Sequence, residues 1–299
     1  MSKKIKSETI YRLNHLPGEE INIDQEFDMK QSYREFDETG NLILEMAFNQ
    51  YGEMADKMEY RYDVNGRLKE TVIYGEDDDE VLERREAVRD KDGRLSKEFI
   101  HYLDGSVDTH EYYYDGKGNL TGMKVVDDEN ELEFSENYYY EDDRLVKIER
   151  CNEYDKVVFR QEDTYENGVI STHKIWSSEE DEPFTLIHHF NAAGHREQEL
   201  RYNSRDQLIE RNIYEEDDHG RLIRIIEENK QRKNTTEFSF DEQGNLTHQV
   251  ETDLNGDLNH EISRFYNAEG ELIQATVETM VKSSGSVLAY SLIYKRETF

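Results

Sequence analysis

The chain has 299 residues, of which 35% are hydrophobic and 35% are charged, and its mean hydropathy is −1.00. This composition lacks the apolar surface for a thick globular core, while an aromatic content of 11% excludes a disordered chain. A formal net charge of −32 repels nucleic acid and anionic membranes and attracts basic proteins. We therefore expect a basic protein partner, no nucleic acid and no membrane. The alternative interpretation is that the charge serves solubility and keeps a long sheet from pairing edge to edge.

The sequence also predicts a cytoplasmic location. Its basic start, Met-Ser-Lys-Lys, is followed by no apolar run, so we expect no signal peptide. No apolar stretch approaches the length of a membrane-spanning helix. Cys151 is the single cysteine, which excludes an intrachain disulfide and fits a reducing compartment.

The first 32 residues predict an atypical N-terminal cap. Thr9 to Leu16, the turn pair Pro17-Gly18, and Ile21 to Phe27 together have the pattern of a divergent β-hairpin. Terminal units of a stacked array are commonly atypical because they cover its open end.

From residue 33 to about residue 280, one short turn recurs with a period of about 26 residues. Its clearest copy is Tyr62-Asp63-Val64-Asn65-Gly66-Arg67-Leu68. The glycine fits a position with positive φ after a type I turn, and the Asp or Asn side chain can bond to the turn backbone. We call the residue that corresponds to Tyr62 in each unit the anchor. The predicted anchors are Phe36, Tyr62, Arg89, Tyr114, Tyr140, Tyr165, Phe190, Tyr214, Phe240 and Tyr266.

The turn predicts how its two strands pair. If Tyr62 faces Leu68, simple alternation pairs Tyr60 with Glu70 and Met58 with Val72 on one aromatic and aliphatic face. Each period also contains a second turn, for example at 103–106, 127–130 and 203–206. Two strands of about 8 residues per period give roughly 20 strands.

The predicted fold is therefore all-β: one domain, residues 1–299, built as an extended antiparallel meander that twists or spirals as an open single sheet. It consists of the cap at 1–32, the recurring units at 33–280, and a C-terminal edge strand at 281–299. The segment Val287 to Tyr294 carries no charge, so we expect it to be buried or to be a contact surface.

The turn motif resembles the YD repeats of RHS-type proteins, through Tyr62 to Leu68 and through Tyr114-Asp115-Gly116-Lys117-Gly118-Asn119-Leu120. It is also similar to the hairpin repeats of MORN-variant antitoxins, through Asn-Gly pairs such as Asn167-Gly168. RHS proteins form a closed shell around a toxin from far longer chains, with a shorter spacing between motifs. The resemblance implies the local hairpin fold, a bacterial setting and, by analogy, an immunity or antitoxin role.

Acidic runs and off-phase tyrosines are the candidate binding residues. The acidic runs fall in both series of turns, and Tyr113 and Tyr139 point away from the anchor face. A solvated surface is the alternative interpretation for both sets. The predicted partner-binding residues are Tyr113, Tyr139, Glu76, Asp77, Asp78, Asp79, Glu80, Glu179, Glu180, Glu215, Glu216, Asp217, Asp218, Leu288 and Tyr290.

Other chemistry has weaker support in the sequence. Asp253 to Glu261 places oxygen ligands at alternate positions, as calcium prefers, but the recurring unit requires a hairpin there. His188 and His189 are adjacent on a strand, point to opposite faces and are poorly placed to share a zinc ion. Trp176 is suited to stacking on a sugar or a peptide. No catalytic motif is present, so we expect a protein that is not an enzyme and has no cofactor.

The sequence predicts a non-enzymatic acidic protein that binds a basic partner, most concretely a bacterial immunity protein or antitoxin. Two alternatives remain open. One is a structural or adaptor subunit of a secretion or phage-related assembly, docked through the C-terminal strand. The other is a DNA-mimic inhibitor whose acidic turns take the place of phosphates.

Overall fold

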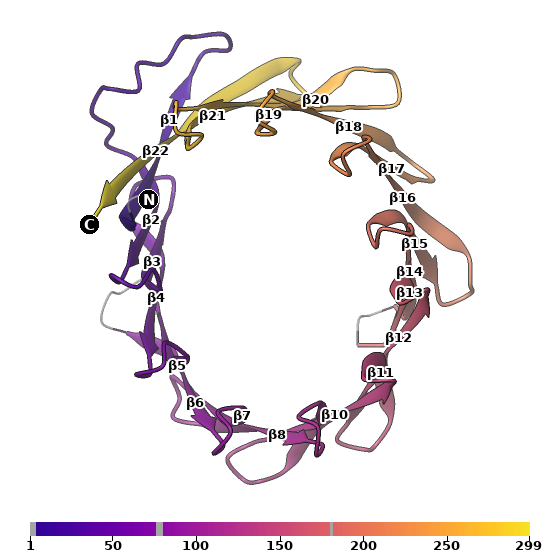
Figure 1. Cartoon of the computed structure of the whole chain (residues 1–299). Coiled ribbons are helices and arrows are strands. Elements are labelled where there is room, and N and C mark those ends of the chain that lie inside the picture. The colour runs from indigo at the N-terminus through magenta and orange to yellow at the C-terminus, as the bar shows by residue number, and fades with distance from the viewer. Residues whose placement is uncertain (1–3, 76–79, 180–181) are drawn as a thin grey trace.

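The protein is a closed ring of antiparallel β-strands in the computed structural model, which describes residues 4–75, 80–179 and 182–299 (Figure 1). The described residues form 22 strands and no helix, and so no helix that could span a membrane. The strands are β1 (Ile5–His15), β2 (Lys30–Phe36), β3 (Leu42–Phe48), β4 (Met54–Tyr62), β5 (Leu68–Tyr74), β6 (Val81–Arg89), β7 (Leu95–Tyr102), β8 (Val107–Tyr114), β9 (Leu120–Val126), β10 (Leu132–Glu141), β11 (Arg144–Asn152), β12 (Val157–Glu166), β13 (Val169–Ser177), β14 (Phe184–Phe190), β15 (Arg196–Asn203), β16 (Leu208–Glu216), β17 (Leu222–Asn229), β18 (Lys233–Phe240), β19 (Leu246–Thr252), β20 (Leu258–Tyr266), β21 (Leu272–Val281) and β22 (Ser286–Thr298).

The all-β prediction is confirmed, but the prediction of an open or spiral sheet is wrong. Each strand pairs with the next along the chain, and β1 pairs with β2 on one side and with β22 on the other. The sheet therefore closes into a 22-stranded barrel, and Ser286–Thr298 is not an edge strand because β21 and β1 pair with both of its edges. The predicted cap hairpin is also wrong, since residues 16–29 form a loop and β1 belongs to the barrel wall.

A bulge beside the turn explains both the curvature and an error in the predicted register. Tyr62 does pair with Leu68, but the register shifts between Arg61 and Tyr62. Met58 consequently pairs with Ile73, one residue beyond the prediction. An equivalent shift lies beside other recurring turns, including those that follow β2, β12 and β20. Bulges increase the local twist, so a bulge at turn after turn bends the sheet and favours closure.

The recurring turns are held by their Asp or Asn side chains. Asp63 Oδ1 accepts the backbone N–H groups of Asn65 and Arg67 at 2.8 and 3.0 Å, and Gly66 has φ of 74°. The turn between β10 and β11 lacks glycine, and there Asp142 and Asp143 both take positive φ, as a two-residue hairpin turn requires. Turns at 103–106, 127–130 and 203–206 are confirmed.

In half of the units, the anchor side chain bonds the hairpin to the one before it. Tyr62 Oη donates to the carbonyl of Leu42 at 2.8 Å, and Tyr114, Tyr165 and Tyr266 make the same bond to Leu95, Leu145 and Leu246. Arg89 replaces tyrosine in the series and donates to the carbonyl of Leu68 at 3.1 Å. In the last strand, Arg296 donates to the carbonyl of Leu272 at 2.9 Å, so the closure of the ring uses an equivalent bond.

One predicted anchor was misplaced by two residues. In the turn between β16 and β17, Glu216 pairs with Leu222 beside the bulge and so occupies the anchor position, whereas Tyr214 pairs with Ile225. The sequence pattern favoured tyrosine because an aromatic side chain fills this position in most other units.

The barrel wall is one layer thick. Among the described residues, strands contact only their hydrogen-bonded neighbours. Few side chains are fully buried as a result, and the largest are Ile293, Val125 and Ser291. The wall is held chiefly by its strand ladders, cross-strand pairs and anchor bonds.

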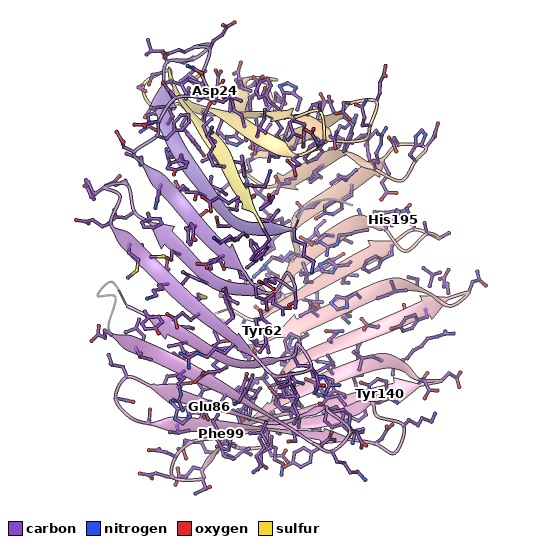
Figure 2. The ribbon with its side chains drawn as sticks, turned by 60° about the vertical axis from the view of Figure 1, so that its left-hand side comes forward. Asp24, Tyr62, Glu86, Phe99, Tyr140 and His195 are labelled. Carbon is purple, nitrogen blue, oxygen red and sulfur yellow. The ribbon has the colours of Figure 1, made fainter. Side chains whose placement is uncertain are left out.

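The loop at residues 16–29 identifies the outer face of the wall. It lies outside the ring in Figure 1, and Asp24 within it is at the top of Figure 2, beyond the strands. Two side chains of the wall contact this loop: the ring of Tyr11 lies 5.8 Å from that of Phe27, and Lys295 Nζ donates to the carbonyl of Ile23. Tyr11 and Lys295 therefore point outward, and the pairing register carries this assignment around the ring.

Candidate functional site

The barrel has two rims that differ in construction. The anchor rim carries the recurring turns, which follow the even-numbered strands β2 to β20, together with the strand ends Ile5 and Thr298. The acidic rim carries the turns that follow the odd-numbered strands, including the loop at 16–29. Both names are kept below.

The net charge of −32 is concentrated in the turns, because acidic and basic residues nearly balance within the strands. Ion pairs account for much of this balance on the outer wall. Arg61 lies 2.7 Å from Glu70, Lys97 lies 2.6 Å from Glu111, and Arg160 Nη2 lies 2.8 Å from Glu149. The acidic rim is the more acidic of the two, and most of its acids lie in the loop at 16–29 and in the segments between β5 and β14.

On the inner wall beside this rim lies a group of acids that we call the acidic cluster: Glu83, Asp108, Asp127 and Glu133. Tyr102 lies among them and donates to Asp108 Oδ2 at 2.7 Å. Burial, this hydrogen bond and the surrounding carboxylates raise the pKa of Tyr102 to about 12. Burial, together with the charges of Asp108 and Asp127, raises the pKa of Glu133. The shift of Glu133 indicates a local excess of negative charge.

Part of the negative charge of the acidic cluster is already balanced or hydrogen-bonded within the protein. Glu83 pairs with Arg85, and the pKa of Arg85 is raised chiefly by this hydrogen bond. Asp127 is partly committed to its turn, because its Oδ1 accepts the N–H groups of Glu129 and Glu131 at 2.9 and 2.8 Å. Among the described residues, neither Asp108 nor Glu133 makes an ion pair. These two carboxylates are therefore available to a cation.

A second polar arrangement crosses the inner wall from β12 to β16. Its two central members, His173 and His188, are direct cross-strand partners with stacked rings 5.3 Å apart. Asp163 lies on one side at 2.6 Å from His173 Nδ1, and Glu199 lies on the other at 2.9 Å from His188 Nε2. Asn212 Nδ2 donates to Glu199 at 2.9 Å. We call these five residues the histidine row.

The predicted site residues do not form one site. Tyr113 and Tyr139 lie on the outer wall, 43% and 41% exposed, and the prediction that they point away from the anchors is confirmed. Leu288 and Tyr290 lie on the inner wall, where the guanidinium of Arg12 is 3.9 Å from the ring centre of Tyr290.

The predicted acidic runs are divided between the two rims. Glu80 is exposed at the acidic rim, and Glu179 there pairs with Arg150 at 3.1 Å. The run from 215 to 218 belongs to the anchor rim, where each of its first three residues has a partner: Glu215 pairs with Arg224, Glu216 with His195, and Asp217 with Arg221. Asp218 is exposed. Glu76, Asp77, Asp78, Asp79 and Glu180 lie outside the described residues.

The metal candidates did not gain support. No group of three or more metal-ligating side chains is suitably placed within the described part of the chain. Asp253 caps a turn and pairs with Lys282 at 2.8 Å, which commits it to the hairpin. Trp176 lies on the outer wall beside Arg160 and Thr185, in a shallow pocket of about 300 Å³.

The sequence pattern does not predict the acidic cluster or the histidine row, because each draws on several strands. His173 and His188 are equally distant from the turn between β13 and β14, so reading outward from that turn pairs them. The adjacent pair His188-His189 drew attention instead, although its members point to opposite faces. Counting register outward from every turn identifies the rest of the row only when the one-residue shifts beside Tyr165 and Phe190 are included.

No family model matches the sequence, and no curated protein matches it. Solved structures do match. A porin-like protein from Bacteroides uniformis is 10% identical, with 98% of this chain and 96% of that chain covered and a TM-score of 0.33. A TcdB2-TccC3-TEV structure is 11% identical over 89% of this chain and 19% of that one, with a TM-score of 0.25. The Photorhabdus luminescens Tc holotoxin pore with mutation TccC3-D651A is 13% identical over 94% and 19%, with a TM-score of 0.25.

The chain therefore spans about a fifth of the Tc toxin chains that it matches. At these TM-scores, the matches carry no inference about activity. The similarity to MORN-variant antitoxins finds no support among these matches.

Proposed function

We propose that the protein is a non-enzymatic scaffold that binds a basic protein at the acidic rim, over the sector from β5 to β14. The supporting observation is the acidic cluster, where Asp108 and Glu133 lack ion-pair partners among the described residues. Burial raises the pKa of Glu133, and the charges of Asp108 and Asp127 raise it further. Like charges held close together repel one another, and a cationic surface that covers them relieves this repulsion and is bound favourably. Lysine and arginine side chains of a partner would provide that surface.

The acidic rim is asymmetric, which gives the partner an orientation. Asp128, Glu129 and Glu131 lie in the turn between β9 and β10, next to the acidic cluster. Farther around the rim, the turn between β17 and β18 carries Lys230 and Arg232. A basic partner would be attracted to the first sector and repelled by the second, so the same rim would both steer and orient it.

Two earlier predictions are not retained. The antitoxin and immunity roles were taken by analogy from the YD-repeat and MORN-variant resemblances, and no match supports them. The adaptor hypothesis used Val287 to Tyr294 as a free docking edge, but both edges of β22 are paired.

The test uses a photo-crosslinking residue at position 128, with the same residue at position 230 as the matched control on the opposite sector of the rim. The expected result is a basic protein crosslinked at 128 and absent at 230. That protein is then purified, and its affinity is measured for wild type and for the quadruple variant Asp128→Asn, Glu129→Gln, Glu131→Gln, Glu133→Gln.

The quadruple variant should bind more weakly, and the affinity of wild type should fall as salt is raised. The control variant neutralises four acids of the anchor rim: Glu38→Gln, Glu166→Gln, Glu242→Gln and Glu269→Gln. Equal affinities for the two variants, or crosslinking that is equal at positions 128 and 230, would overturn the proposal.

A further inference from the structure

The histidine row is a set of ionisable groups that plays no part in the proposed binding surface. His173 and His188 are stacked with an interplanar angle of 8°, on neighbouring strands of the inner wall. The side chains of Asp163 and His188 are 6% and 10% exposed. A buried row of this kind is sensitive to each proton it gains or loses, because little water is present to screen the change.

The charged groups that face the two imidazoles come from two of the strands packed around them, β12 and β15. Asp163 lies on β12, where Gln161 Nε2 donates to its second oxygen at 2.9 Å. On β15, Glu199 faces His188, and Arg196 Nη1 lies 3.1 Å from Glu199 Oε2. β14 contributes no charge here; the ring of Phe190 packs edge-on against His188. β16 contributes the neutral amide of Asn212, with Glu210 farther along the same strand.

These charges allow one proton on the histidine pair and oppose a second. With both imidazoles neutral, the two carboxylates outweigh the single guanidinium of Arg196 by one negative charge. One proton therefore brings the row to neutrality, whereas a second leaves it positive and places two cationic rings face to face. Interacting groups of this kind release their protons in two separate steps that belong to the pair.

His188 is the member at which the second proton is least favourable. Burial lowers the pKa of His188, and the positive charge of Arg196 and the neighbouring His173 lower it further, while Glu199 opposes them. Its Nε2 is buried and lies 2.9 Å from Glu199 without the alignment of a hydrogen bond. Protonation of His188 would therefore bring repulsion from Arg196 and His173, which the attraction of Glu199 offsets only in part.

We infer that the histidine row is a pH-sensitive switch: acidification that places a charge on both stacked imidazoles weakens the pairing of β13 with β14. The sign follows from the direction of the shift. A histidine that is easier to deprotonate in the folded state contributes stability above its unfolded midpoint, and that stability is lost as the pH falls.

The first test is titration of ¹³C-labelled histidines by NMR in wild type and in His173→Gln and His188→Gln. In wild type, the two histidines should titrate in steps separated by at least about one pH unit. In His173→Gln, the step of His188 should move to higher pH, because the second cation is gone. Coincident steps in wild type, with His188 unmoved in His173→Gln, would contradict the inference.

The second test is hydrogen exchange of the β13 and β14 amides at pH 7.5 and pH 5.5, corrected for the intrinsic rates. Exchange should rise at least about fivefold at pH 5.5 in wild type, relative to β4 and β5, and should not rise in His188→Gln. The control His260→Gln removes another inner-wall histidine, whose ring bonds to Thr279 rather than stacking on a second imidazole. If His188→Gln does not fold, Glu199→Gln replaces it and should enhance the acid response. If exchange of the β13 and β14 amides does not rise at pH 5.5 in wild type, the inference is wrong.

Discussion

The two rims of the barrel are built from similar turns but differ in what those turns carry. On the anchor rim, Asp63 caps its turn through two backbone N–H groups, and Asp127 does the same on the acidic rim. The anchor rim adds side chains that bond to the preceding hairpin, as Tyr62 does to Leu42. The acidic rim has more varied turns and more unpaired charge. The two rims thus share a turn geometry. The anchor rim adds bonds that stabilise the wall, whereas the acidic rim varies in the charge that it presents.

The largest expected effect is the loss of an anchor. Replacing Tyr62 with Ala removes its hydrogen bond and its ring packing, and we expect a loss of about 3 kcal/mol in the free energy of unfolding. Tyr62→Phe, which removes the hydroxyl alone, should lose about 1 kcal/mol. Urea denaturation measures both.

Tyr51 is the matched control on the acidic rim, since it is 75% exposed in the turn between β3 and β4. Tyr51→Ala should change the free energy of unfolding by less than about 0.5 kcal/mol. If Tyr51→Ala is as destabilising as Tyr62→Ala, the two rims do not differ in the way described.

The next effect concerns the two sectors of the acidic rim. Lys230→Glu combined with Arg232→Glu would extend the acidic charge around the rim, so the association rate of a basic partner should rise about three- to tenfold at low salt. The gain should shrink as salt is added, because it is a long-range effect. Stopped-flow association measures it, and an unchanged rate would show that this sector does not steer the partner.

A smaller effect, equal at both rims, is expected from the turn glycines. Gly66 on the anchor rim and Gly256 on the acidic rim have φ of 74° and 82°, and neither has a neighbouring atom within 4 Å of an added Cβ. Alanine should therefore cost about 1 kcal/mol at each position through backbone strain alone. Gly122 in β9 has no positive φ, so Gly122→Ala serves as the control and should cost less. A large difference between Gly66→Ala and Gly256→Ala would show that the turns are not equivalent.

The sequence predicted the local structure far better than the closure of the sheet. The pattern around Tyr62 establishes the turn, the Tyr62–Leu68 pair and the opposite orientation of Tyr113 and Tyr139. Closure depends on the small bend that each bulge adds, summed over the whole sheet, and no single motif records that sum. The same one-residue shifts decide which side chains meet three or four strands away, which is why His173 and Asp108 were not recognised as site residues.

The smallest expected effect comes from Asp217→Asn. This substitution distinguishes the contribution of the turn hydrogen bonds from that of the negative charge. The backbone N–H of Arg221, its guanidinium and the backbone N–H of His219 lower the pKa of Asp217 to about 2. A carboxyl with a lowered folded-state pKa contributes stability above its ordinary value of 3.8, and loses it as the pH falls toward 2. Asp217→Asn retains an oxygen that accepts the same N–H groups, as Asn191 does in its own turn.

The variant should therefore match wild type closely at pH 7 and lose less stability between pH 4 and about 2.5. The difference between the two proteins is the informative quantity, because protonation of the many other acids affects both equally. Urea denaturation across this pH range measures it. A variant as acid-sensitive as wild type would show that Asp217 acts through geometry alone and that its charge contributes nothing to the turn.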